Sequence, residues 1–136
     1  MEYEQENQLS IIHENDLISV RKTLRVITGE LGFSLIDTTR IVTAASELTR
    51  NILIYAGSGV MIWRKMDGNG RRGLELVFTD YGPGIDDVEV AMKTGFTTSK
   101  GLGLGLPGTK RLMDEMQIES RPGNGTTITV RKWQKR

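Results

Sequence analysis

The spacing of apolar residues changes near Gly59, and this change limits the folds open to the chain. Before Gly59, two segments carry apolar side chains three and four residues apart, the period of one face of an α-helix. The two stripes are Leu17, Val20, Leu24, Ile27 and Leu31, then Ile41, Ala44, Ala45, Leu48, Ile52 and Tyr55. After Gly59 the apolar runs are short and separated by turn residues, which is typical of β-strands. We therefore expect helices packed on a sheet.

Capping and turn residues predict where these elements begin and end. The run Glu14-Asn15-Asp16 and Asp37 are expected to start two helices, which Gly32 and Gly57 then end. Strands are predicted at 8–13, 60–66, 74–80, 117–121 and 126–133, with further helices at 86–92 and 106–116. The residues at 67–70, Asp-Gly-Asn-Gly, are a strong hairpin signal. Tight turns imply antiparallel pairing, so we predict an α/β two-layer sandwich whose mixed, largely antiparallel sheet is covered on one face by helices.

Size and composition exclude several classes of protein. A length of 136 residues predicts one domain spanning 1–136, and a net charge of +1 gives no electrostatic argument for binding nucleic acid. No apolar run approaches the roughly 20 residues of a membrane span, and the polar N-terminus is unlike a signal peptide, so a cytoplasmic protein is expected. The absence of Cys and the single His13 argue against disulfides and His- or Cys-based metal sites. The basic segment 131–136 is expected to be a solvated tail.

Glu47 and Asn51 are the first residues that could carry chemistry. They lie four residues apart on the second predicted helix, so their side chains share a face. A carboxylate can act as a general base, and an amide oxygen can bind Mg²⁺, which prefers hard oxygen ligands. Taken alone, the pair also fits an ordinary solvated helix surface.

Asp80, Gly82 and Gly84 directly follow an apolar strand. A carboxylate at the end of a strand can accept a hydrogen bond from a ligand amino group, such as that of a purine. Glycines two and four residues later would let the backbone come close to that ligand. The same residues also fit an ordinary turn.

A run of glycines at 101–108, GLGLGLPG, leads into a predicted helix. Free backbone N–H groups and the positive end of the helix dipole favour a phosphate there. Gly103, Gly105 and Gly108 also spell the dinucleotide fingerprint G-x-G-x-x-G. That reading fails because no buried strand precedes the run and no acidic residue stands about 20 residues further on. A Walker A motif is excluded because Thr-Lys, not Lys-Ser/Thr, follows Gly108.

Gly125 and Thr126 enter the last predicted strand and complete an ordered set of motifs. The set resembles the GHKL (Bergerat-fold) ATPase and kinase superfamily: Glu47-x-x-x-Asn51 is similar to its N box, Asp80-x-Gly82-x-Gly84 to its first glycine box, 101–106 to its second, and Gly125-Thr126 to its terminal motif. The resemblance extends over about residues 37–133. The stretches ASELTRN, FTDYGPGI, GFTTSKGLGLGL and NGTTITV look like the small bacterial serine kinases of partner-switching pathways, particularly the stressosome-associated type.

The resemblance implies a role for each candidate residue, with ATP and Mg²⁺ as the ligands. Glu47 would be the general base, and Lys100 is a candidate for stabilising charge on the γ-phosphate. Asn51 would hold Mg²⁺. The nucleotide would be bound by Asp80 at the adenine amino group, with Gly82, Gly84 and Thr126 near it and Gly101, Gly103 and Gly105 around the phosphates. The span from Gly84 to Gly101 would form a lid over ATP.

The same resemblance implies partners. The substrates would be small STAS-domain regulatory proteins, and the released kinase would activate a PP2C-type phosphatase. Two alternatives remain open. An anti-sigma-factor-type sequestering protein would bind nucleotide only for regulation, although Glu47 speaks against a site without a base. The catalytic domain of a sensor histidine kinase would need a phospho-accepting helical hairpin, which the first 35 residues do not supply.

Overall fold

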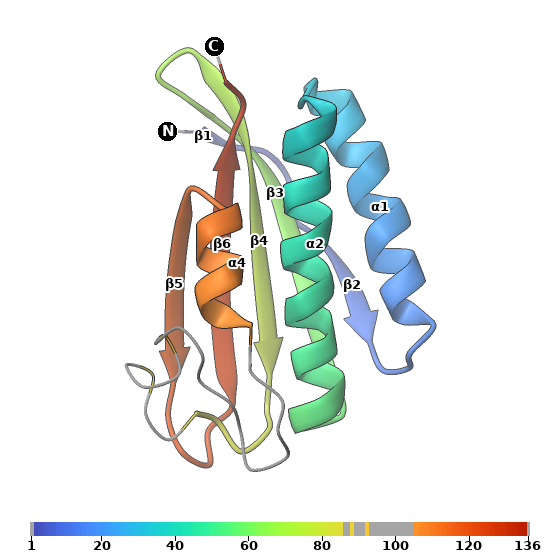
Figure 1. Cartoon of the computed structure of the whole chain (residues 1–136), viewed down its shortest axis with the longest axis vertical. Coiled ribbons are helices and arrows are strands. Elements are labelled where there is room, and N and C mark those ends of the chain that lie inside the picture. The colour runs from blue at the N-terminus through green and yellow to red at the C-terminus, as the bar shows by residue number, and fades with distance from the viewer. Residues whose placement is uncertain (1, 86–87, 89–91, 93–104, 136) are drawn as a thin grey trace.

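The computed structural model describes residues 2–85, 88, 92 and 105–135 (Figure 1). In chain order its elements are β1 (Glu2–Tyr3), β2 (Asn7–Ile11), α1 (Asp16–Leu31), α2 (Leu35–Asn51), the π-helix η1 (Ile52–Ala56), β3 (Gly59–Gly68), β4 (Arg71–Asp80), α4 (Leu106–Leu112), β5 (Glu115–Ser120) and β6 (Thr126–Trp133). Within these residues the predicted order is confirmed, and the short β1 is an addition to it. The helix predicted at 86–92 lies largely outside the described residues.

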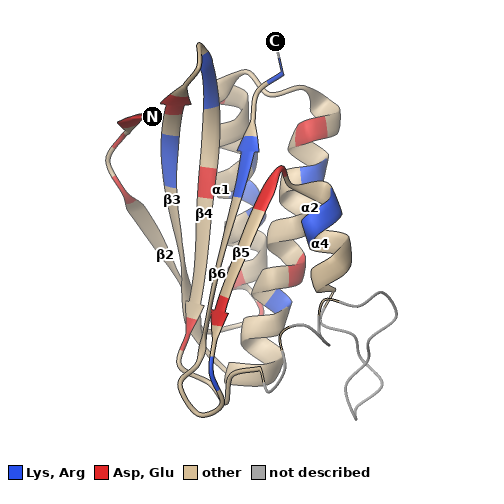
Figure 2. Ribbon diagram, turned by 90° about the vertical axis from the view of Figure 1, so that its left-hand side faces the viewer, with Lys and Arg blue, Asp and Glu red and all other residues tan. Residues whose placement is uncertain are grey.

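The strands form one sheet with the order β1-β3-β4-β6-β5, and β2 pairs with β3 beyond the end of β1. All five strand pairings in the described part of the chain are antiparallel. The helices lie on one face of this sheet, as the two views in Figures 1 and 2 show. Between β3 and β4, Asn69 and Gly70 both have positive φ, of 53° and 74°, as a two-residue type I′ hairpin turn requires. The predicted α/β two-layer fold is confirmed.

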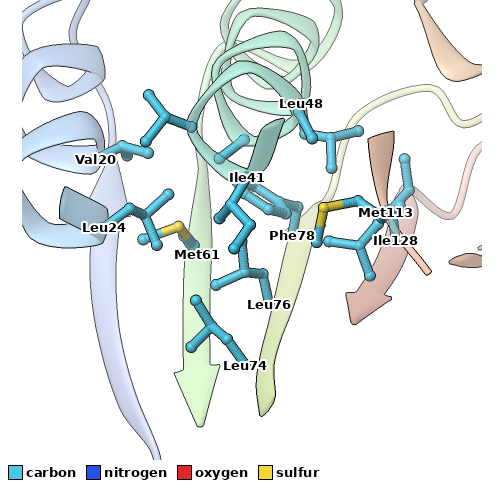
Figure 3. Close-up of a cluster of buried hydrophobic side chains, with 14 of the residues drawn as sticks. Val20, Leu24, Ile41, Leu48, Met61, Leu74, Leu76, Phe78, Met113 and Ile128 are labelled. Carbon is cyan, nitrogen blue, oxygen red and sulfur yellow. The ribbon is translucent and has the colours of Figure 1, made fainter. Parts of the chain in front are cut away.

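The core lies between α2 and the sheet, with α1 closing one side (Figure 3). Side chains of the two predicted helical stripes point into it, among them Leu24, Ile41 and Leu48, all at most 1% exposed. They meet Met61 and Leu76 from the central strands, which are also fully buried. Each such side chain contributes about 1.5–3 kcal/mol by leaving water. This packing fixes α2, and with it Glu47 and Asn51, against the sheet.

The helix α1 begins within the predicted run 14–16 but is capped differently, and α2 begins before the predicted Asp37. Asn15 makes no side-chain cap; instead the Asp16 carboxylate accepts hydrogen bonds from the backbone N–H groups of His13 and Ile12. These bonds, with that of His13 first, hold the pKa of the Asp16 carboxyl below its usual value. In α2 the cap is Ser34, whose hydroxyl accepts from the N–H of Asp37 at 3.1 Å. Asp37 is therefore inside the first turn, where its buried carboxylate pairs with Arg40 at 3.0 Å instead of capping the start of the helix.

The C-terminal half contains two further differences. The helix predicted at 106–116 ends at Leu112, because Met113 adopts an extended backbone and Met116 belongs to β5. The basic segment at 131–136 is not a solvated tail over its first residues, since β6 continues to Trp133. Lys132 is 5% exposed, and its ammonium donates to the carbonyl of Leu112 at 2.9 Å.

Four charged side chains form a row across the sheet face that the helices leave uncovered. Arg64 on β3, Glu75 on β4, Arg131 on β6 and Glu115 on β5 stand opposite one another in register. Figure 2 shows the alternation of blue and red along these neighbouring strands. Glu75 is 1% exposed and accepts from the Nε of Arg64 and the Nε of Arg131, each at 2.8 Å. Its buried charge is therefore satisfied from both sides.

Replacing Glu75 with Gln is expected to lower the free energy of unfolding by about 2 kcal/mol, because two partly buried guanidinium groups lose their shared counter-charge. Urea denaturation would measure the change. Glu115→Gln is the matched control: it removes the outer, half-exposed partner of Arg131 and is expected to cost less than about 1 kcal/mol. Equal losses of stability in the two variants would show that the burial of Glu75 does not increase the cost of removing its charge.

Candidate functional site

The predicted site residues that the structure describes lie toward the end of the sheet opposite the chain termini (Figure 1). Glu47 and Asn51 belong to the C-terminal part of α2, Asp80 ends β4, Gly105 directly precedes α4 and Thr126 begins β6. Gly82 and Gly84 lie in the loop after β4. Lys100, Gly101 and Gly103 fall outside the described residues, as does most of the span predicted to be a lid.

Glu47 lies directly against the start of α4. A methyl group placed on Gly105 would come within 2.7 Å of the Glu47 Oε2 atom, so the missing side chain at 105 makes room for this carboxylate. Gly105 also has φ +69°, a conformation that glycine adopts without strain. Glu47 remains accessible, with its side chain 41% exposed, and Arg50 lies 3.5 Å away one helical turn further on. The carboxylate is thus held at the surface beside the glycine run predicted to bind phosphate.

Asn51 lies where α2 passes into η1, one helical turn from Glu47. In η1 the N–H of Gly57 bonds to the carbonyl of Ile52, five residues earlier. Among the residues that the structure describes, no three acidic, His or Cys side chains gather closely enough to hold a metal ion. A single amide oxygen still fits Mg²⁺ in a nucleotide site, since that ion commonly takes one or two protein ligands and completes its shell with phosphates and water.

Asp80 and Thr126 are brought together by strand pairing. They are direct partners in the β4–β6 register, so their side chains emerge side by side from the same face of the sheet. One carboxylate oxygen of Asp80 accepts from the N–H of Gly82 at 2.9 Å, which turns the chain sharply at the end of β4. A carboxylate can accept about four hydrogen bonds, so this one leaves capacity for a ligand N–H.

Close packing within the chain leaves no room for a side chain at three glycines: Gly82, Gly84 and Gly125. A Cβ at Gly82 would lie 2.6 Å from the Cβ of Ala56, one at Gly84 would lie 2.1 Å from the carbonyl oxygen of Arg121, and one at Gly125 would lie 2.2 Å from the carbonyl oxygen of Asp80. The sequence suggested room for a ligand as the reason for the first two glycines. The structure shows a different reason: Gly82 packs against Ala56 of η1, whereas at Gly84 and Gly125 the loop after β4 and the turn before β6 lie backbone against backbone.

Ser120, the last residue of β5, belongs to this site and was missed from the sequence. Its hydroxyl bonds to the N–H of Ile85, the carbonyl of Gly125 and the hydroxyl of Thr126, at 2.8, 3.0 and 2.8 Å. It also lines an open hollow of about 500 Å³ that includes Thr126 but not Glu47, Asn51 or Asp80. Symmetric pairing of the predicted strands around the Pro-Gly-Asn-Gly turn would place Arg121, not Ser120, opposite Thr126; the observed register is shifted by one residue, so no sequence signal points to Ser120.

The chain is similar to several known proteins. A family model described as histidine kinase-, DNA gyrase B-, and HSP90-like ATPase matches residues 36–136. Over 123 residues the chain is 47% identical to the serine/threonine-protein kinase RsbT of Bacillus subtilis, covering 90% of this chain and 92% of that protein. Over 140 residues it is 30% identical to the anti-sigma F factor of Caldanaerobacter subterraneus, covering 98% and 96%.

A solved structure of the RsbU and RsbW domains of a Mycobacterium tuberculosis protein has the same fold, with a TM-score of 0.61 at 22% sequence identity. The match covers 96% of this chain but only 33% of the other. No helix in the described ranges is long and apolar enough to cross a membrane.

Proposed function

Because this chain belongs to the family of histidine kinase-, DNA gyrase B- and HSP90-like ATPases and is a serine/threonine-protein kinase, we propose that it acts in a bacterial stress-response pathway of partner switching. In this proposal it transfers the γ-phosphate of ATP to a Ser or Thr hydroxyl of small STAS-domain proteins. ATP as the phosphate donor implies action in the cytoplasm. One observation carries the proposal furthest: the Glu47 carboxylate lies against Gly105, so a base and the expected phosphate site meet at one place.

The adenine would lie over the paired ends of β4 and β6. Asp80 would accept from its amino group, with Thr126 beside it in register. Gly82 and Gly84 would shape the loop that bounds the base, held down by their close contacts with Ala56 and Arg121. From there the phosphates would extend toward the start of α4 and the glycine run at 101–105.

Asn51 would hold Mg²⁺ through its amide oxygen. The ion, when bound, would supply positive charge that offsets the negative charge developing on the phosphates. Glu47 would accept the proton of the substrate hydroxyl as that oxygen attacks phosphorus, and the partly exposed position of its carboxylate leaves it open to a protein substrate. Lys100 would stabilise charge on the γ-phosphate.

A test combines the purified protein with Mg-ATP labelled at the γ-phosphate and the STAS-domain protein that co-purifies with it. We expect acid-stable label on Ser or Thr of the partner, and no label when EDTA removes the metal. Failure to label the partner, or an acid-labile phosphohistidine, would contradict the proposal.

A second role belongs to the same proposal. After phosphorylation of the STAS-domain protein, the released kinase would bind and activate a PP2C-type phosphatase. The alternative function, an anti-sigma-type protein that sequesters its partner, is favoured by the 30% identity to an anti-sigma F factor. The labelling assay separates the two, since a pure sequestering protein would capture its partner and bind nucleotide without transferring phosphate.

A further inference from the structure

Three polar residues form a row at the site end of the sheet. Asp80, Thr126 and Ser120 are successive register partners on β4, β6 and β5. The next row on the same face is apolar, with Phe78 and Ile128 in the core. Because side chains alternate along a strand, the three polar side chains face the helices, where the adenine is proposed to lie. The row extends the proposed adenine site by one strand.

The hydrogen bonds of Ser120 fix the direction of the bond to Thr126. A hydroxyl has one proton to donate and two lone pairs to accept with. The carbonyl of Gly125 can only accept, so the Ser120 proton goes there, at 3.0 Å. The N–H of Ile85 can only donate, so it takes one Ser120 lone pair. The remaining bond, 2.8 Å to Thr126, therefore has Thr126 as the donor.

The direction of this bond limits what Thr126 can offer a ligand. Once its proton is used toward Ser120, the Thr126 oxygen can only accept from anything that binds beside it. Asp80, when ionised, also only accepts. Two neighbouring acceptors suit the two N–H donors of an exocyclic amino group and disfavour a carbonyl oxygen at the same position.

We propose that Ser120 is a positioning residue that holds the Thr126 hydroxyl as an acceptor and thereby sets the preference of the site for a 6-aminopurine. The proposal rests on the proposed nucleotide site. Ser120 acts through Thr126, and it also ties Ile85 to the turn before β6, so that the loop and the acceptor pair keep one geometry.

The test compares binding of ATP with binding of inosine triphosphate, which carries a carbonyl oxygen in place of the 6-amino group. Calorimetry would measure both dissociation constants for the wild-type chain and for Ser120→Ala. We expect the wild type to prefer ATP. In Ser120→Ala the Thr126 hydroxyl is free to turn and donate, so the preference should shrink by about fivefold, the worth of one hydrogen bond.

Two variants separate positioning from general damage. Ser120→Thr keeps the hydroxyl and is expected to restore the ATP preference. Thr127→Ala removes a hydroxyl from the neighbouring position on the opposite face, where it pairs with Thr79 at 3.3 Å, and should leave the preference unchanged. If Ser120→Ala weakens both nucleotides equally, or leaves the ratio as in the wild type, the inference about Ser120 is overturned. If the wild type binds neither nucleotide, the proposed function itself fails.

Discussion

Replacing Glu47 with Gln is expected to lower kcat for transfer to the protein substrate by about 10²- to 10⁴-fold, the usual contribution of a general base. The amide has nearly the same shape as the carboxylate, so it fits the space beside Gly105, but it cannot take a proton at neutral pH. Binding of ATP should change little, because Asp80 and Thr126 lie on other elements. Label transfer and calorimetry on the same preparation measure the two quantities.

Glu30→Gln is a suitable control for this variant. Glu30 is a half-exposed helix carboxylate paired with a lysine, Lys65, as Glu47 is paired with an arginine, but it lies on α1. It should leave kcat unchanged, since an exposed ion pair is worth at most about 1 kcal/mol to stability. Activity in Glu47→Gln close to the wild type would remove Glu47 from the mechanism.

Replacing Gly125 with Ala is expected to weaken ATP binding by at least about tenfold, through displacement of the end of β4. The added methyl group would lie 2.2 Å from the Asp80 carbonyl oxygen and 2.9 Å from the Tyr81 Cα, and neither backbone atom can turn aside alone. Asp80 would move away from Thr126, so the loss should appear in the dissociation constant for ATP.

Gly123→Ala is the matched control within the same turn. Gly123 has φ +81°, close to the +78° of Gly125, but a Cβ there would meet nothing within 4 Å. It should cost about 1 kcal/mol of stability from the unfavourable φ and leave ATP binding near the wild type. Similar losses of binding in both variants would mean that φ, and not crowding against Asp80, accounts for the effect.

Periodicity predicted the helices and the strands because burial repeats along an element. Leu24 and Leu48 follow the helical period and lie in the core as expected. The same rule extended α4 too far: Met113 and Met116 continue a helical spacing, yet they belong to a turn and a strand. Short apolar runs fit either structure, and only tertiary pairing decides between them.

The site residues that belong to the ordered motifs could be predicted from the sequence. Those whose role depends on contacts between distant segments could not. The sequence placed Asp80 at the end of a strand and Glu47 on a helix surface, and both lie there. It could not show that Gly84 is pressed against Arg121, because that contact joins two turns far apart in the chain. Ser120 could not be predicted for a similar reason: a lone serine at a strand end belongs to no motif, and its three hydrogen-bond partners come from two other segments.

The π-helix η1 and the loop after β4 lie so close together that neither has room for a larger side chain where they meet. Its last residue, Ala56, faces Gly82 so closely that even one carbon atom on Gly82 would overlap it. A larger residue at 56 would push on the loop that follows Asp80, and any side chain at 82 would push on the end of η1, which follows Asn51. The side-chain volumes tolerated at these two positions are therefore coupled, although the positions are 26 apart in the sequence.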